Sequence, residues 1–265
     1  MNSNVSQSLL TTEDAPPVRV INPKGASSFL LIGDHAGNRV PAQLGSLGLS
    51  DAELSRHIGW DIGIGELGAL LAERLDAVFV RQTYSRLVID CNRSAQQPDA
   101  IAKVSDGTFI PGNANLSEEA RARRFAEIHE PYQSAIGAEL ARRDASGMAT
   151  IIVALHSFTP AMSGALRDQQ RPWQIGILHD GGDPGFAQAL IQTLQAEGDL
   201  TVGDNEPYRM DLIDYTIPRH AYPGRRPYAE IEVRQDLLGS TEGCEEWADR
   251  LARLLPAGLG RMRAG

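Results

Sequence analysis

Short apolar runs alternate with longer amphipathic segments along most of the chain. The short runs are rich in valine, isoleucine and leucine and predict strands at 18–21, 28–32, 77–81, 87–91, 150–155, 174–179, 200–204 and 229–233. The amphipathic segments predict helices at 50–75, 116–143, 186–197 and 244–255. Strands that alternate with helices form a mostly parallel sheet covered on both faces, so we expect a three-layer α/β fold with a mixed sheet.

The length and composition of the segments predict how the chain is divided into domains. Residues 1–17 are polar, lack the apolar core of a secretory signal and predict a flexible arm. Residues 18–265 have the length of one large α/β domain. No apolar run approaches the roughly 20 residues of a membrane span. We therefore expect a single α/β domain that has no membrane partner.

Composition narrows the function classes. The apolar share of 42% is ordinary for a globular protein, and the net charge is −9. A surface that binds nucleic acid needs a basic face, so this balance argues against nucleic acid as a partner. Cys91 and Cys244 are the only cysteines and have no metal or redox spacing, which predicts free thiols in a reducing cytoplasm. The sequence does not specify an oligomeric state.

Two histidines follow buried strands. His35 comes shortly after the apolar run at 28–32, and His156 follows the run at 150–155. The carboxyl ends of parallel strands meet at one edge of a sheet, where each strand fixes the backbone and the next loop opens to solvent. We therefore expect His35 and His156 to converge as metal ligands. The alternative for either histidine alone is a hydrogen bond that caps a loop.

Two carboxylates are candidates for completing such a site, because two histidines and a carboxylate are a common zinc set. Asp34 precedes His35 and would point to the opposite face of its strand. Asp61 lies four residues after His57 in the predicted helix, so the two would share one helical face. The alternative for Asp61 is a capping carboxylate or a surface ion pair.

Arginines surround the apolar run at 87–91. Arg86 precedes the run, and Asn92 and Arg93 follow it. A guanidinium group binds a carboxylate through two parallel hydrogen bonds, so these three side chains suit a small anionic substrate. The alternative is a salt bridge to Asp90 or to a helix end, and we expect at least one of the arginines to be structural.

Glu230 and Glu232 lie on one face of the last predicted strand, because side chains alternate along a strand. Ile231 and Val233 indicate partial burial, and a buried carboxylate needs a partner or a role in proton transfer. Either glutamate is a candidate general base for a metal-activated water. The alternative is that both are exposed on an edge strand. The chain has no dinucleotide fingerprint, P-loop or Gly-x-Ser-x-Gly motif.

Together, these segments resemble the N-formylglutamate amidohydrolase family. The resemblance runs from about residue 28 to residue 238 and is carried by 34–41, 57–63, 84–93, 110–113, 154–160 and 231–236. It implies a zinc-dependent hydrolase with a phosphorylase/hydrolase-like α/β fold, similar to zinc carboxypeptidases. One position departs from the carboxypeptidase order: three residues after His35, where those enzymes have a glutamate, this chain has Asn38. The carboxylate ligand must therefore come from elsewhere.

The resemblance also implies a role for each candidate residue. His35 and His156 would bind one Zn²⁺ per chain, with Asp61 as the third ligand and Asp34 orienting or replacing it. Glu232, or alternatively Glu230, would take the proton of the activated water and pass it to the leaving amine. The side chains that would contact the substrate are Arg86, Asn92, Arg93, Tyr84 and Asn38.

We therefore expect a metal-dependent amidohydrolase that acts on a small anionic N-acyl amino acid. N-formyl-L-glutamate, cleaved to formate and the amino acid, is the expected substrate. One alternative is a hydrolase of another N-acyl or peptide-like amide on the same fold. The other is a binding protein for small carboxylates, which would have no catalytic activity and would need no zinc.

Overall fold

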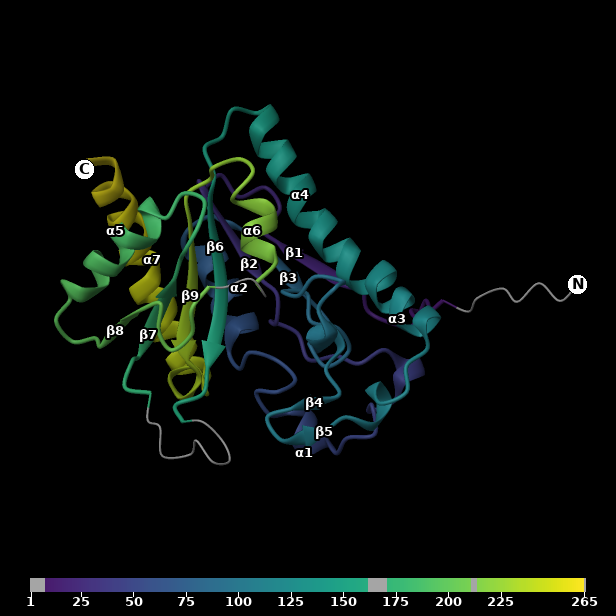
Figure 1. The fold of residues 1–265 in the computed structure, drawn as a ribbon. Coiled ribbons are helices and arrows are strands. Elements are labelled where there is room, and N and C mark those ends of the chain that lie inside the picture. Colours follow the sequence, from purple (N-terminus) through teal and green to yellow (C-terminus); the bar gives the residue numbers. More distant parts are fainter. Residues whose placement is uncertain (1–7, 162–170, 211–213, 265) are drawn as a thin grey trace, which may run out of the picture.

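A mixed sheet forms the centre of the computed structural model, which describes residues 8–161, 171–210 and 214–264 (Figure 1). Its seven strands lie in the order β1-β3-β2-β6-β9-β7-β8. β1 pairs antiparallel with β3, and β7 with β9, whereas the other neighbours are parallel. The strands are β1 Val18–Ile21, β2 Phe29–Gly33, β3 Val78–Gln82, β6 Ile151–Phe158, β7 Ile175–Leu178, β8 Val202–Asp204 and β9 Tyr228–Arg234.

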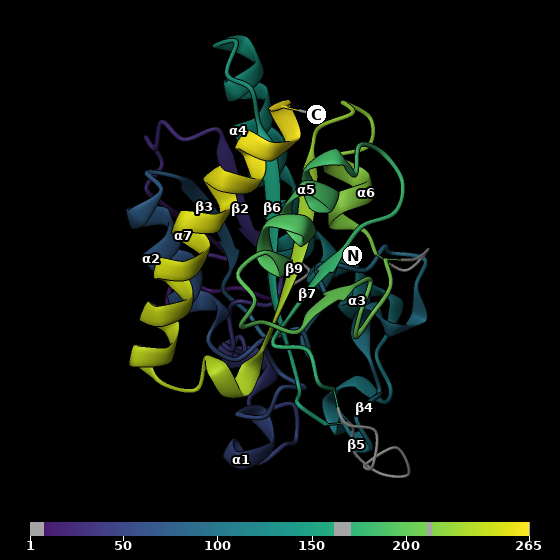
Figure 2. The same cartoon turned by 90° about the vertical axis from the view of Figure 1, so that its left-hand side faces the viewer.

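Helices cover both faces of this sheet (Figure 2). On one face, α2, α5 and α7 pack against side chains such as Leu31, Val153 and Ile231. On the other face, α4 and α6 pack against the alternate side chains, including Leu30 and Ile152. The helices are α1 Asp51–Leu54, α2 Ile64–Arg74, α3 Glu118–Arg124, α4 Glu130–Ala145, α5 Gly185–Gln195, α6 Thr216–His220 and α7 Thr241–Ala264. The predicted three-layer α/β fold is confirmed.

The helix predicted at 50–75 is two helices separated by an irregular segment. α1 is only four residues long, and residues 55–63 form turns. α2 begins after Gly63, whose φ of 82° is a left-handed conformation that favours glycine. His57 and Asp61 therefore do not share a helical face, and that part of the prediction is wrong.

Residues 84–116 form a layer of loops beside the sheet. The strand predicted at 87–91 is wrong: these residues form buried turns, in which the Asp90 amide donates to a backbone carbonyl at 2.8 Å. Their apolar side chains pack with Leu47 and Ile110 in a third cluster, separate from the two clusters on the sheet. Burial under loops, not sheet pairing, explains this apolar run. The loops also contain a small hairpin, β4 Val104–Ser105 and β5 Thr108–Phe109.

The long helix predicted at 116–143 is present as α3 and α4 joined by a π-helical turn, Phe125–His129. Ser117 begins it as predicted, because its side chain accepts a hydrogen bond from the Ala120 amide. The π turn directs His129 inward, where its Nε2 lies 2.9 Å from the carbonyl oxygen of Arg93. The helix thus contacts the loop that carries the predicted substrate-binding residues.

The described part of the predicted arm, residues 8–17, is packed. Leu9 is only 6% exposed and joins the third apolar cluster. The amides of Leu9 and Leu10 each donate to the Glu127 carboxylate at 2.9 Å. These contacts hold residues 8–10 against the π-helical turn Phe125–His129, and a flexible arm over 1–17 stays a prediction. Residues 1–7 lie outside the described residues.

Both cysteines are free and buried, which confirms the predicted thiols. Cys91 belongs to the apolar cluster of α4 and Cys244 to the cluster of α2, so they lie on opposite faces of the sheet. Within the described ranges, no helix has the length and apolar character to cross a membrane.

Candidate active site

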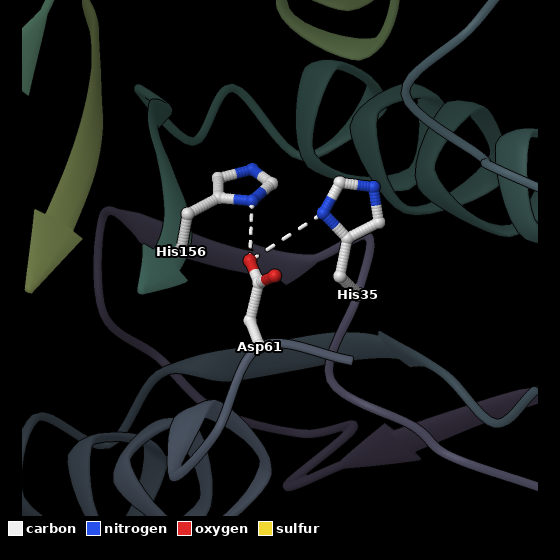
Figure 3. A group of neighbouring side chains, drawn as sticks. All are labelled: His35, Asp61 and His156. Carbon is white, nitrogen blue, oxygen red and sulfur yellow. Dashed lines mark hydrogen bonds and ion pairs between the residues drawn. The ribbon is translucent and has the colours of Figure 1, made fainter. Parts of the chain in front are cut away.

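Three side chains converge at the carboxyl edge of the parallel strands (Figure 3). His35 follows β2, and His156 lies near the carboxyl end of β6, the strand that pairs with β2. Asp61 comes from the turns before α2, and its amide donates to the His35 carbonyl at 2.9 Å. The sheet therefore fixes both histidines, and a backbone hydrogen bond fixes the aspartate beside them.

The polar atoms of these side chains are placed to share one cation. Asp61 Oδ2 lies 2.9 Å from His156 Nδ1 and 3.4 Å from His35 Nδ1. One ligand atom from each residue lies within 4.8 Å of the others. All three side chains are buried. Two imidazole nitrogens and one carboxylate oxygen in this arrangement match the three-ligand set of catalytic zinc sites.

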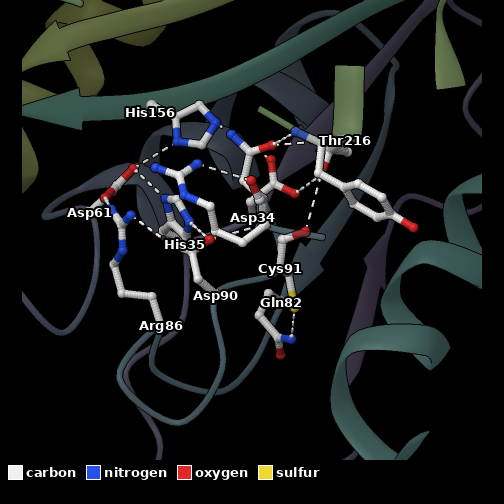
Figure 4. Close-up of polar contacts among 12 residues, drawn as sticks. Asp34, His35, Asp61, Gln82, Arg86, Asp90, Cys91, His156 and Thr216 are labelled. Atoms are coloured by element: carbon white, nitrogen blue, oxygen red, sulfur yellow. Dashed lines mark hydrogen bonds and ion pairs between the residues drawn. The ribbon is translucent and has the colours of Figure 1, made fainter. Parts of the chain in front are cut away.

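Each histidine ring faces a second carboxylate with its Nε2 atom, on the side away from Asp61 (Figure 4). Asp90 Oδ1 lies 2.7 Å from His35 Nε2, and Asp34 Oδ2 lies 3.4 Å from His156 Nε2. Carboxylates in this position orient metal-binding histidines and hold the ring proton on the far nitrogen.

The hydrogen bonding of His35 tests whether these residues fit a metal. With the ring proton directed at Asp90, the Nδ1 lone pair points toward the carboxylate of Asp61. This Nδ1 has no hydrogen-bond partner among the described residues. Two electron-rich atoms so close together need a proton or a metal cation between them. The residues therefore fit Zn²⁺.

The charges of the cluster shift its pKa values. Burial opposes ionisation of Asp61, but the charge of His35 and a hydrogen bond from His156 lower the pKa of Asp61 well below its usual range. Burial would also lower the pKa of His156, yet its hydrogen bonds to Asp34 and Asp61 raise it well above its usual range. The raised pKa of His156 reflects the negative charge of the carboxylates around it, and that charge favours a bound cation.

Arg86 reaches the same cluster from the turns that precede Asp90. Its Nη2 donates to Asp90 Oδ2 at 2.5 Å, and its Nη1 lies 3.7 Å from Asp61 Oδ1. Burial would lower the pKa of Arg86, but the charges of Asp90 and Asp61 raise it. Arg86 is thus a permanent cation at the pocket wall, and it makes the salt bridge to Asp90 that the structural alternative predicts.

Asn92 and Arg93 line the pocket and also contact the protein. Asn92 Oδ1 accepts from the Thr216 amide at 2.9 Å, and its Nδ2 donates to Asp214 at 3.1 Å. Arg93 Nε donates to Asp99 at 3.2 Å, and its Nη1 lies 3.7 Å from Asp214. Asn92 therefore anchors the start of α6, and Arg93 brings positive charge to the pocket.

The pocket beside the histidines has a volume of about 380 Å³. Its wall is rich in titratable side chains. Besides the residues above, it includes His57, Tyr208, Arg209, Asp214, Glu230 and Glu232. This volume lies in the range of small-molecule sites and suits an amino-acid derivative.

Glu230 and Glu232 face the pocket from β9. Glu232 lies opposite His156 in the register of β6 and β9. Burial raises the pKa of Glu232 to about 7, and its Oε2 has no hydrogen-bond partner within the described ranges. Burial raises the pKa of Glu230 well above its usual range. The edge-strand alternative is wrong because β9 lies between β6 and β7.

Asp34 lies next to His156, on the side of the ring away from Asp61. It is 1% exposed, and its Oδ1 accepts a hydrogen bond from Thr216 Oγ1 at 2.6 Å. Its Oδ2 faces His156 Nε2. Of the two carboxylates that the sequence leaves open, Asp61 is the one whose oxygen meets the Nδ1 atoms of both histidines. Asp34 is therefore placed to orient a ligand and not to replace Asp61.

Two predicted substrate contacts lie elsewhere. The Tyr84 hydroxyl donates to the Ala15 carbonyl at 2.6 Å, and its ring packs in the third apolar cluster. Asn38 Nδ2 donates to the Leu54 carbonyl at 2.9 Å. Neither side chain lines the pocket. In contrast to the prediction, the side chains of Tyr84 and Asn38 hold loops together.

Other residues of the site were not predicted. The sequence suggests Asp90 only as an ion-pair partner, although it contacts both a histidine and an arginine of the site. Tyr208, Arg209 and Asp214 lie in the long connection between β8 and α6, where no apolar period shows which way a side chain points. The length of that loop was the available signal.

Comparisons with known proteins bear on what such a site does. The family model described as N-formylglutamate amidohydrolase matches residues 27–238. The crystal structure of a gene product from Agrobacterium tumefaciens is 34% identical, with a TM-score of 0.91 over 96% of this chain and 99% of that chain. The crystal structure of N-formylglutamate amidohydrolase from Ralstonia eutropha JMP134 is 20% identical, with a TM-score of 0.71 over 95% of this chain and 100% of that chain. No curated protein matches the chain.

Proposed function

The chain belongs to the N-formylglutamate amidohydrolase family, and on that basis we propose that it hydrolyses an N-acyl amino acid with one bound Zn²⁺. Membership of the family makes it a hydrolase of amide bonds. The proposal adds the metal and the substrate, which we take to be N-formyl-L-glutamate, cleaved to formate and L-glutamate.

One observation carries the metal part of the proposal. His35, Asp61 and His156 converge, while Asp90 and Asp34 stand behind the two imidazole rings. Zinc held there would supply Lewis acidity, which polarises an amide carbonyl and acidifies water. The histidine and aspartate side chains would fix its position, and the carboxylates behind the rings would increase the basicity of the histidines.

Glu232 is the proposed general base. Its carboxyl faces the pocket opposite His156, and its pKa of about 7 lets it accept a proton and release it near neutral pH. It would take a proton from the attacking water and deliver that proton to the nitrogen of the leaving amine. Glu230, the alternative base, lies two residues earlier and is set further from the register position of His156.

The arginines would bind the anionic parts of the substrate. Arg86 lies 3.7 Å from Asp61, so its guanidinium is placed to stabilise the oxygen of a carbonyl that reacts beside the metal ligands. Arg93, supported by Asn92, would hold the α-carboxylate of the amino acid. The leaving product would then be an amino acid whose carboxylate stays bound until its amine has been protonated.

Formate release from N-formyl-L-glutamate tests this proposal. Protein loaded with zinc should contain about one Zn²⁺ per chain and release formate, and a chelator should abolish the release. His156→Ala should lose most of the metal and the activity. His179→Ala is the matched control, because His179 pairs with Asp204 and does not line the pocket. Full zinc occupancy in both His35→Ala and His156→Ala would show that the metal site is misassigned.

The same experiment separates the alternatives. Release of another acyl group from a panel of N-acyl amino acids, with none from the formyl substrate, would support a different amidohydrolase. Binding of carboxylates by zinc-free protein, without any turnover of the panel, would support the binding protein and contradict our proposal.

A further inference from the structure

Three of the described residues that line the pocket are arginines, and they differ in their partners. Arg86 forms a salt bridge with Asp90, and Arg93 forms one with Asp99. Arg209 also lines the pocket, yet it takes part in no hydrogen bond or ion pair with any residue of 8–161, 171–210 and 214–264. Its positive charge is therefore not neutralised within the described protein.

The segment that carries Arg209 is held against the sheet by close backbone packing. The carbonyl oxygen of Glu206 occupies the space where a Cβ atom on Gly176 would lie. A Cβ on Gly203 would be 2.5 Å from the same oxygen. Only glycine at these two positions of β7 and β8 lets the segment approach so closely. The backbone that precedes Arg209 is thus fixed in position.

A second contact fixes the neighbouring side chain. Arg171 is 8% exposed; its Nη1 donates to the Tyr208 hydroxyl at 2.9 Å, and its guanidinium lies 4.7 Å from the centre of the Tyr208 ring. Tyr208 lines the pocket directly before Arg209. Glycine packing at Glu206 and the Arg171 contact at Tyr208 therefore fix the backbone directly before Arg209, which lines the pocket.

The charges around the pocket indicate a role for Arg209 in binding an anionic group of the substrate. The Asp61 and Asp214 carboxylates line the same space, so a substrate with two carboxylates would be repelled unless a cation compensated for each. Arg93 serves the α-carboxylate in the proposed function. A second carboxylate needs a second cation, and Arg209 is the one whose charge has no partner in the described protein.

We propose that Arg209 binds the side-chain carboxylate of the substrate and makes the enzyme selective for N-acyl derivatives of acidic amino acids. This inference rests on the proposed function. Arg209 would act on specificity by contact with the substrate, at the end remote from the bond that is cleaved. An N-formyl amino acid of equal size with a neutral side chain would lack this contact.

The test compares N-formyl-L-glutamate with N-formyl-L-glutamine, which differ by one charge at the side chain. We expect wild type to favour the glutamate derivative, and Arg209→Ala to lower kcat/KM for it by roughly 10- to 100-fold, the loss of one charge-assisted hydrogen-bonded contact. The glutamine derivative should respond much less. Arg209→Lys should be intermediate, because it keeps the charge but not the planar donor pair. Arg261→Ala, an equal charge change at an exposed position of α7, should leave both substrates unaffected.

Binding of the products separates failure of this inference from failure of the proposed function. Calorimetry should show that wild type binds L-glutamate more tightly than L-glutamine and that Arg209→Ala loses this preference. That result without any formate release would refute the proposed reaction and leave the Arg209 assignment standing. An Arg209→Ala protein that keeps the preference for glutamate overturns the inference, as does a wild type with no preference. An equal penalty on both substrates also overturns it, because Arg209 would then hold the α-carboxylate.

Discussion

At the scale of single residues, the site depends on the carboxylates that face both nitrogen atoms of each histidine ring. His35 and His156 each face Asp61 with Nδ1 and a further carboxylate with Nε2. The sequence could predict the two histidines because the carboxyl edge of parallel strands follows from topology. It could not predict the role of Asp90, because that role depends on buried turns whose apolar residues look like a strand.

Asp90→Asn tests the support given to His35. The amide keeps the shape but cannot hold the ring proton as a carboxylate does, so zinc affinity should fall by roughly 10- to 100-fold. Competition with a chelator of known affinity would measure the change. Asp204→Asn, which alters the partner of His179 away from the pocket, should leave zinc affinity at the wild-type value. Equal affinity in wild type and Asp90→Asn would show that Asp90 serves only Arg86.

Glu232→Gln tests the general base. The variant keeps the shape of the side chain but removes its proton acceptor, so kcat should fall by on the order of 100-fold or more. Zinc content should stay near one per chain, because Glu232 is not among the clustered ligands. Steady-state kinetics and elemental analysis measure the two quantities. Near-normal turnover would transfer the role to Glu230, whose own Gln variant would then be inactive.

At the scale of elements, those whose apolar side chains contact the sheet were predictable, and those shaped by distant contacts were not. The strands at 29–33 and 151–158 follow their apolar runs closely. The break between α1 and α2 depends on Gly63, where a Cβ would overlap the side chain of Leu238, far away in the sequence. Helical periodicity over 50–75 contains no sign of that contact.

Two helix glycines should respond in opposite directions to alanine. Among the described residues, a Cβ on Gly137 of α4 would meet a single atom, of His220 at 3.9 Å, so Gly137→Ala should raise the free energy of unfolding by about 0.5–1 kcal/mol. A Cβ on Gly68 of α2 would overlap the buried ring of Phe79, so Gly68→Ala should lower it by roughly 1–3 kcal/mol. Urea unfolding measures both values. Equal signs would contradict the packing described around one of these glycines.

At the scale of the whole molecule, the layered fold was predictable because alternating strands and helices allow few other arrangements. The strand order was not, because it places β9, late in the chain, between β6 and β7. That order brings Glu232 beside His156. The connection from β8 to α6, which adds Tyr208 and Arg209 to the pocket, likewise depends on contacts that no local pattern encodes.

The stability of the whole protein should depend on the protonation of His220. Burial and the nearby charge of Arg219 lower the pKa of His220 from 6.5 to about 4, and its Nε2 lies 2.8 Å from Gln133 Oε1. Between these pH values the unfolded chain binds a proton that the folded chain does not. The free energy of unfolding should therefore fall as the pH drops from 6.5 toward 4, and stay unaffected by this group above 6.5.

Comparison with His220→Gln isolates this contribution. Wild type should lose roughly 1–3 kcal/mol more than the variant between about pH 7 and about pH 4, because one pKa unit corresponds to about 1.4 kcal/mol. Urea unfolding at a series of pH values gives both curves. Parallel curves would show that His220 titrates alike in the folded and unfolded chains.

The third apolar cluster has a consequence for how such a protein can diverge. His35 and His156 depend on strands between the two clusters of the sheet, whereas Arg86 and Arg93 are carried by the loops around the third cluster. Substitutions within 84–116 would therefore alter the groups that bind the substrate and leave the strands that carry both histidines unchanged. Under selection for a new acyl amino acid, these loops can change around Asp90, which must be kept because it faces His35, while the strands that carry both histidines are inherited unchanged.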